Sequence, residues 1–291
     1  MGDGRCPACG GPGRDRKYQV EGLDLYRCRL CRTEYFVQRP DRASYSKLYW
    51  DGYKLAIYAD EQVKAEYESR YDEILTDVLA EYPDVHSVLD IGCGIGNFVD
   101  WAGRRGLRAV GSDLDERAVD SARERGLEVY HADDLDEHVA PGSVDMITLW
   151  DVIEHVYDPR DLLASALVYL RPGGIVVMET PDVSFPARPV VIAIRKVAEP
   201  IRWSDALYFA GHKVYFSARG LSTLMARCGL DVVGQRGMRS PNAKMANLFE
   251  HLAANGGGVG RLGARMYKPL DRAMRTAHIN NKLIMVGRKP E

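Results

Sequence analysis

The chain has 291 residues, of which 46% are hydrophobic and 27% charged, and its formal net charge is −2. This composition is typical of ordinary soluble globular proteins and gives no overall attraction to nucleic acids or membranes. No apolar stretch approaches the ~20 residues needed to cross a bilayer, and the first residues lack the apolar core of a signal peptide. We therefore expect a cytoplasmic protein without a membrane span.

Four of the six cysteines form two C-x2-C pairs near the start of the chain. Cys6 and Cys9 lie in CPAC, Cys28 and Cys31 lie in CRLC, and 18 residues separate the pairs. In a reducing compartment this spacing is typical of a tetrahedral zinc site, with redox or chance pairing as the alternative. A site closed by four thiolates has no open position, so we expect a structural zinc that folds residues 1–38 as a zinc-ribbon-like module.

A Tyr-rich connector covers residues 39–85. Apolar residues at helical spacing in its second half, followed by Pro83, predict a helix there. The tyrosines of this segment either pack as a helix face or line a ligand pocket: Tyr45, Tyr49, Tyr53, Tyr58, Tyr67 and Tyr71.

From residue 86 onwards, short apolar runs alternate with amphipathic helical segments. The strand-like runs are SVLDIG, RAVGSDL, EVYHAD, VDMITLW and IVVMETP, and the helical segments are GNFVDWAGRRG, DERAVDSARERG and PRDLLASALVYLRPGG. This rhythm predicts an α/β fold in which helices cover both faces of a parallel sheet. After Pro181 the pattern breaks for about thirty residues. It resumes with helical SARGLSTLMARCG and the strands LDVVGQRG and KLIMVGRKP.

Three glycines, Gly92, Gly94 and Gly96, follow the first of these strands where a helix should begin. In a doubly wound sheet, ligands bind at this turn, beyond the carboxyl ends of the strands. The G-x-G-x-G spacing differs from the G-x-G-x-x-G of dinucleotide sites, and Asp113 ends the next strand. A carboxylate there can accept from both ribose hydroxyls, so the pattern predicts a nucleoside site that does not require a pyrophosphate.

Six motifs in order resemble the class I S-adenosylmethionine-dependent methyltransferases: VLDIGCGIG, AVGSDLDE, YHADDLDE, PGSVDMITLWDVIEHV, LRPGGIVVMETP and KLIMVGRKP. The similarity is best to the ubiquinone-pathway-like and tailoring O-methyltransferase branch, which carries EHV and, later, a GHxxYFS motif, here GHKVYFS. The resemblance implies a Rossmann-like, seven-stranded, mostly parallel sheet over residues 86–291, with an antiparallel last strand. It also implies a helical lid insertion over an acceptor pocket at about 182–211, with simple packing on the domain or contact with a membrane surface as alternatives. The sequence itself places a helical insertion at about 241–277.

The resemblance also implies which residues bind the cofactor. Asp90 would order the ammonium group, Asp113 would hold the ribose and Leu114 would lie against the adenine. Asp133 would accept from the adenine amino group, with helix capping as the alternative role for these acids. The implied cofactor-binding residues are Asp90, Gly92, Cys93, Gly94, Gly96, Asp113, Leu114, Asp133, Asp134 and Trp150.

Methyl transfer to a hydroxyl requires close positioning and a base that removes the proton. In WDVIEHV, Asp151, Glu154 and His155 would share one face if the segment were helical. His155 is the first candidate for the base and His212 of GHKVYF the second, with a purely structural role as the alternative. Some relatives bind a divalent metal with the acids and histidine of this motif, so a metal there is a further hypothesis.

The leading functional hypothesis is O-methylation of a small-molecule or glycan hydroxyl. The alternatives are a zinc-ribbon RNA methyltransferase, a C- or N-methyltransferase of a sugar or natural product, and a non-catalytic cofactor-binding protein. Balanced charges in the ribbon and the lack of an NPPY-type motif weigh against a nucleic-acid partner. A basic stripe is either a solvated helix face or a dock for an anionic or carrier-linked acceptor: Arg261, Arg265, Lys268, Arg272 and Arg275.

Overall fold

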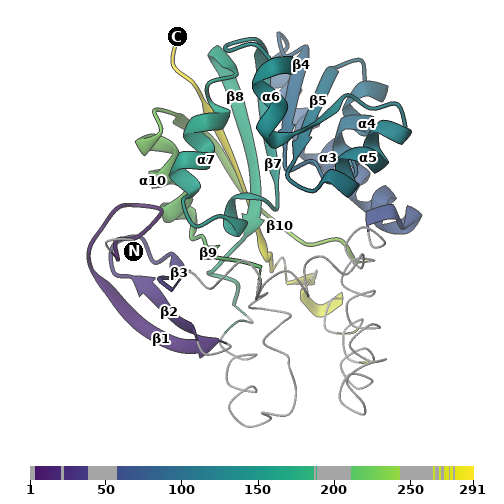
Figure 1. Cartoon of the computed structure of the whole chain (residues 1–291). Coiled ribbons are helices and arrows are strands. Elements are labelled where there is room, and N and C mark those ends of the chain that lie inside the picture. Colours follow the sequence, from purple (N-terminus) through teal and green to yellow (C-terminus); the bar gives the residue numbers. More distant parts are fainter. Residues whose placement is uncertain are drawn as a thin grey trace.

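A seven-stranded sheet lies at the centre of the computed structural model (Figure 1). The structure describes residues 4–20, 23–38, 58–186, 188, 211–242 and 279–291, with isolated positions between 265 and 277. The order of the strands is β10-β11-β8-β7-β4-β5-β6, and β11 runs antiparallel to both of its neighbours. The strands of this sheet are β4 (Ser87–Ile91), β5 (Arg108–Asp113), β6 (Val129–His131), β7 (Val144–Trp150), β8 (Leu170–Pro181), β10 (Asp231–Met238) and β11 (Lys282–Arg288).

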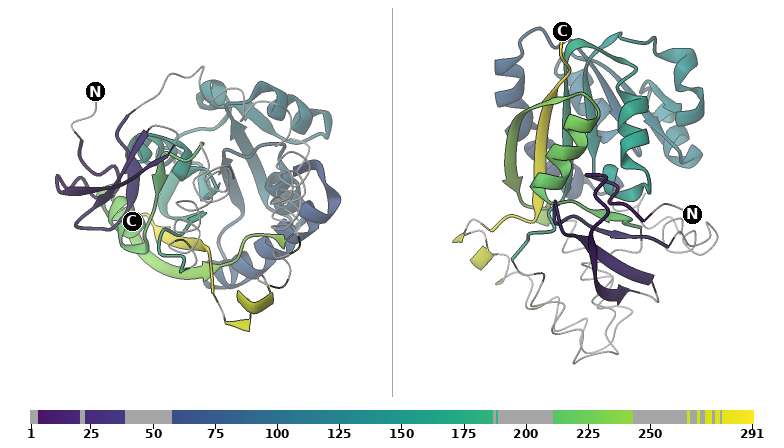
Figure 2. Two further views of the ribbon diagram at one scale, coloured as in Figure 1. Left: turned by 90° about the horizontal axis from the view of Figure 1, so that it is seen from below. Right: turned by 90° about the vertical axis from the view of Figure 1, so that its left-hand side faces the viewer.

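Helices connect these strands and cover both faces of the sheet (Figures 1 and 2). The helices are α3 (Glu61–Glu81), α4 (Asn97–Arg104), α5 (Glu116–Glu124), α6 (Leu135–His138), α7 (Pro159–Ala166) and α10 (Ala218–Arg227), with short 3-10 turns η1 (Ala132–Asp134) and η2 (Ile153–His155). The predicted fold class, including the antiparallel last strand, is confirmed. None of the helices among the described residues is both long enough and apolar enough to cross a bilayer.

One predicted boundary is wrong. The segment PRDLLASALVYLRPGG was expected to be helical throughout, but α7 ends at Ala166 and β8 begins at Leu170. Leu170 pairs in parallel register with Val144, and Gly173 adopts a left-handed backbone conformation with φ 71°. Residues from Leu170 onwards therefore join the sheet, although the apolar spacing of this segment also suits a helix. The lid predicted at 182–211 and the helical insertion at 241–277, with its basic stripe, lie largely outside the described residues.

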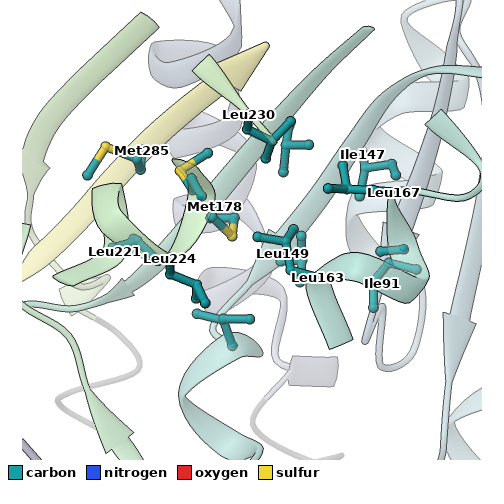
Figure 3. Packing of buried hydrophobic residues seen from close by; sticks show 14 of the residues in the cluster. Ile91, Ile147, Leu149, Leu163, Leu167, Met178, Leu221, Leu224, Leu230 and Met285 are labelled. Atoms are coloured by element: carbon teal, nitrogen blue, oxygen red, sulfur yellow. The ribbon is translucent and has the colours of Figure 1, made fainter. Parts of the chain in front are cut away.

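Alternation along the strands divides the core between the two faces of the sheet. Figure 3 shows side chains from β7 and β8, including Leu149 and Met178, packed beside Leu221 and Leu224 of α10. On the opposite face, Met146 and its neighbours pack against α3 and α4. Tyr67 and Tyr71 of α3 are buried within this second cluster, and Tyr71 lies 5.0 Å from Phe98 between ring centroids. These two tyrosines pack a helix face, whereas Tyr45, Tyr49 and Tyr53 lie outside the described residues.

The N-terminal strands form a second sheet with a strand from far along the chain. Its order is β1-β2-β3-β9, in which β1 (Arg14–Val20), β2 (Leu23–Cys28) and β3 (Glu34–Phe36) are joined by β9 (Val214–Tyr215). Figure 1 and the right-hand view of Figure 2 place these strands beyond the end of the large sheet where β8 finishes. The cysteine-bearing module is therefore connected by backbone hydrogen bonds to the rest of the protein.

Asp145 joins the starts of three central strands. Its carboxylate accepts hydrogen bonds from Arg171 Nε at 2.6 Å, from Ser87 Oγ at 2.7 Å and from the backbone of His86 and Ser87. Burial alone would raise the pKa of Asp145, but these hydrogen bonds lower it to about 2.

Because the folded-state pKa lies below the unfolded value, Asp145 stabilises the protein above about pH 4, and this contribution is lost as the pH falls towards 2. We expect Asp145→Asn to lower the free energy of unfolding by roughly 2 kcal/mol at pH 7. Denaturant titrations of both proteins should show the difference shrinking below pH 4. The same substitution at the exposed Asp231 serves as the control, and an equal loss there would contradict this assignment.

Candidate functional site

The glycine turn after β4 adopts a backbone conformation that favours glycine. Gly92, Gly94 and Gly96 have φ values of 71°, 54° and 78°. A Cβ atom on Gly94 would meet no atom within 4 Å, whereas one on Gly92 would lie 2.6 Å from a methyl group of Val152. Open space at Gly94 leaves its backbone accessible, and the close contact at Gly92 packs the turn against the segment that follows β7.

Asp113 connects this turn to the end of β5. Its Oδ2 accepts from the Gly94 backbone N–H at 2.8 Å, and its Oδ1 accepts from that of Asp115 at 2.9 Å. Each oxygen retains a lone pair that a ribose hydroxyl could use. Beside it, Leu114 is 60% exposed although it is a large apolar residue. A carboxylate next to an uncovered apolar side chain fits the ribose and base of a nucleoside, while Asp133 lies exposed on η1.

Two titratable groups lie at the start of the turn: the buried Asp90 and the partly buried Cys93. Asp90 is almost fully buried and accepts a hydrogen bond from Thr148 Oγ1 at 2.7 Å. Burial, with the nearby charge of Asp113, raises the pKa of Asp90 to about 8. An ammonium group bound nearby would favour the charged carboxylate, which fits the role expected for Asp90. Burial also raises the pKa of the Cys93 thiol well above its usual range, which suits an inert packing residue.

The segment WDVIEHV is not an α-helix. Its acids and histidine were expected to share a face only if it were helical, so that arrangement does not form. Asp151 has a φ of 57°, and only Ile153–His155 form the short 3-10 turn η2. The Asp151 carboxylate instead forms an ion pair with Lys282 of β11. Asp151 therefore points towards the start of β11, and it is not part of the cluster formed by Glu154, His155 and His212.

In the described part of the chain, possible metal-ligand atoms of Glu154, His155 and His212 lie within 4.8 Å of one another. The imidazole rings of the two histidines are 4.6 Å apart between centroids, and His212 Nε2 lies 3.9 Å from Glu154 Oε1. Burial, reinforced by the charge of Asp151, raises the pKa of the Glu154 carboxyl to about 8. The two candidate bases therefore lie beside an acid whose neutral form is favoured by burial. With Asp151 these residues form what we call the acceptor side of the site.

One contact shows which ring nitrogen of His155 carries the proton. His155 Nδ1 lies 3.1 Å from the carbonyl oxygen of Gly211. Because a carbonyl oxygen only accepts, Nδ1 carries the proton and Nε2 of the neutral ring is left as a proton acceptor.

Sequence reasoning missed a buried ionic network beside Asp151. Glu179 of β8 pairs with Arg70 of α3, and Lys282 Nζ lies 3.8 Å from Glu179 Oε1. These side chains are nearly fully buried, where a charge is tolerated only with a partner. The signal was present in the sequence, since Glu179 interrupts the apolar run of β8 and Lys282 begins the apolar strand β11. Trp150, which ends β7, packs against Tyr71 with 5.0 Å between ring centroids.

The four N-terminal cysteines converge on one point. The Sγ atoms of Cys6 and Cys31 are 3.6 Å apart, and those of Cys9 and Cys28 are 3.5 Å apart. A tetrahedral zinc with Zn–S bonds of about 2.3 Å requires sulfur separations of about 3.8 Å, so the donor set fits this ion. The residue after each pair, Gly10 or Arg32, has a positive φ, which gives the two turns the same geometry.

Comparison with known proteins identifies the domain. A family model described as a methyltransferase domain matches residues 60–235. The ubiquinone biosynthesis O-methyltransferase of Sodalis glossinidius is 33% identical over 101 residues, covering 32% of this chain and 41% of the relative. The enzyme of the same name from Bordetella pertussis is 30% identical over 176 residues, covering 58% of this chain and 72% of the relative. That from Cupriavidus pinatubonensis is 30% identical over 158 residues, with 52% and 62% covered, so the chain spans less than two thirds of several relatives.

Solved structures share the fold at low sequence identity. A SAM-dependent methyltransferase from Archaeoglobus fulgidus superposes with a TM-score of 0.51 and 16% identity, covering 82% of this chain and all of that one. The plantazolicin methyltransferase BamL, solved with SAH, gives a TM-score of 0.52 and 15% identity, covering 82% and 90%.

Asp113→Ala should weaken the binding of S-adenosylhomocysteine, measured by calorimetry, by more than about tenfold, or roughly 1.4 kcal/mol. The reason is that the substitution removes an acceptor for ribose hydroxyls and also frees the N–H of Gly94. Asp120→Ala, on the exposed face of α5, is the matched control. A loss below tenfold at Asp113 would show that the ribose is held elsewhere.

Metal analysis should find one zinc per chain, and replacing Cys6 and Cys28 together with serine should abolish it. Zinc affinity should fall as the pH is lowered, because the metal must displace the thiol protons. A purified protein that contains no metal would contradict the zinc site.

Proposed function

Because the chain belongs to the methyltransferase-domain family of class I S-adenosylmethionine-dependent enzymes, we propose that it methylates a hydroxyl group of a small-molecule or glycan acceptor. The contact of His155 Nδ1 with the Gly211 carbonyl oxygen carries this proposal, because it leaves Nε2 as a base on the acceptor side. The names of the relatives from Sodalis and Bordetella support transfer to oxygen.

The cofactor end of the site is the turn between β4 and α4. When bound there, S-adenosylmethionine supplies a methyl group on a positively charged sulfur. Asp113 would hold the ribose, Leu114 would cover the adenine and the charged form of Asp90 would balance the ammonium group. These positions lie at the ends of neighbouring parallel strands, so the cofactor would extend along the edge of the sheet towards Trp150.

On the acceptor side, His155 would accept the hydroxyl proton at Nε2 as the oxygen attacks the methyl carbon. Fixing Nδ1–H on the Gly211 carbonyl holds the ring in the required tautomer throughout. Burial and the charge of Asp151 raise the pKa of the Glu154 carboxyl, which would reduce the negative charge beside the acceptor oxygen. His212 is the second candidate for the base, and its position beside Glu154 also allows a bound cation, which we treat as a separate outcome of the tests.

The four-cysteine module would hold a structural zinc. Reduced cysteines suit a cytoplasmic location, which we propose for this protein. We propose residues 1–38 as this module, residues 39–85 as its connector and residues 86–291 as the methyltransferase domain.

Labelled methyl donor added to a cell extract separates the acceptor classes. Small-molecule or glycan fractions should take up the label, and alkali- and acid-stability of the product should identify a methyl ether. Label confined to RNA would overturn the proposal in favour of an RNA methyltransferase, and label on carbon or nitrogen would exclude O-methylation.

With the acceptor found in this way, His155→Ala should reduce kcat by roughly a hundredfold or more while the affinity for S-adenosylhomocysteine stays the same. The acidic limb of the pH profile should disappear with the base. His212→Ala is the comparison, and the same signature there but not at His155 would reverse the two roles. Activity that resists a chelator would exclude a catalytic cation at Glu154, His155 and His212.

A further inference from the structure

We infer that the four-cysteine module is a structural part of the acceptor side: it fixes residues 211–217 and, through them, the positions of His155 and Glu154. The inference rests on the proposed function only in naming this edge the acceptor side. It assigns positioning roles to Thr33 and to the strand pair β3–β9, which lie outside the reacting groups.

One side of residues 211–217 is held by the module. Glu34 and Tyr35 of β3 pair with β9, and the Phe36 N–H donates to the Lys213 carbonyl at 3.1 Å. Next to Cys31, Thr33 Oγ1 accepts from the Ser217 N–H at 3.4 Å, while the Ser217 hydroxyl donates to the Cys31 carbonyl. A ligand of the metal site is therefore one hydrogen bond away from this segment.

The opposite side of the same segment contacts the candidate base. The Lys213 N–H donates to the Glu154 carbonyl at 2.7 Å, and the Gly211 carbonyl accepts from His155 Nδ1. The segment is thus bonded to the module on one side and to η2 on the other. Within η2, the His155 N–H donates to the Val152 carbonyl oxygen at 2.9 Å. Because η2 is only three residues long, its position depends on the contacts with Gly211 and Lys213.

Burial and charge make this connection specific. Thr33 and Glu34 are fully buried, and a Cβ atom on Gly220 would lie 1.9 Å from Thr33 Oγ1. Glu34 accepts from Arg27 Nε at 2.8 Å and from Arg188 Nη2 at 2.9 Å. The Arg188 guanidinium also lies 4.9 Å from the ring centroid of Tyr215 in β9, so Arg188 links the buried Glu34 carboxylate to the segment. Unpairing such buried groups carries a large penalty.

Helix α10 contacts both cysteine turns. The hydroxyl of its N-terminal cap, Ser217, donates to the Cys31 carbonyl oxygen. Arg227 in its last turn donates to the Ala8 carbonyl oxygen at 2.8 Å. Ala8 lies between Cys6 and Cys9, so each half of the metal site is attached to one end of the helix. In the described part of the chain, by contrast, the backbone N–H groups of the cofactor turn donate to Ser112 and Asp113 of β5 and not to the module.

Two variants of the full-length protein test this inference. The first, Cys6→Ser with Cys28→Ser, removes the metal, and Cys228→Ser is its control. The second, Thr33→Val, keeps the metal but removes the acceptor for the Ser217 N–H, and Thr223→Val on α10 is its control. Three measurements need no acceptor substrate: S-adenosylhomocysteine affinity by calorimetry, the His155 tautomer by nitrogen NMR, and amide hydrogen exchange of residues 214–217.

Both test variants should keep S-adenosylhomocysteine affinity within about twofold while the amides of residues 214–217 exchange at least about fivefold faster. The metal-free variant should also lose the fixed Nδ1–H tautomer of His155. Unchanged exchange and an unchanged tautomer would overturn the inference, as would a parallel loss of cofactor affinity, which indicates general destabilisation. If the double variant fails to fold, Thr33→Val decides by itself. These readouts are independent of methyl transfer, so they distinguish failure of this inference from failure of the proposed function.

Discussion

The parallel alignment of β4 between β5 and β7 is the constraint on which the site depends. Parallel strands joined by helices all finish at the same edge of the sheet, where residues distant in sequence meet. The glycine turn, Asp113 and the segment from Trp150 to His155 each follow the end of one of these strands. Because the alternating apolar residues of the strands bury both faces of the sheet, that edge is where polar groups can remain accessible.

The same edge holds an unusual number of buried charges. Arg70, Glu179, Lys282 and Asp151 balance one another, so the interior beside the reacting groups carries little net charge. Such a network is costly to break by removing one partner. It gives the left-handed backbone at Asp151, which lies two residues before η2, an electrostatic anchor.

The sequence allowed the fold to be predicted and the residues of the cofactor end to be proposed, because both depend on local patterns. The glycine spacing, Asp113 and the strand–helix rhythm each report on contiguous residues. The acceptor side could not be derived in this way, since His155 is oriented by Gly211 and Asp151 by Lys282, contacts between distant segments. The helix predicted beyond Ala166 failed for the same reason, because pairing of Leu170 with Val144 overrode its helical spacing. The roles of the individual site residues stay predictions.

The two-residue strand β9 also bears on how the chain is made. Glu34 and Tyr35 cannot form their strand pairing with β9 until Val214 and Tyr215 have been synthesised, roughly 10–35 s later at ordinary rates of synthesis. During that interval β3 presents an unpaired edge of the kind that invites pairing with another chain. Early capture of a metal by the nascent cysteines would hold the short hairpin together until its last strand arrives. In that order of synthesis, all four cysteines of the proposed zinc site are available before the domain on which the module finally rests is complete.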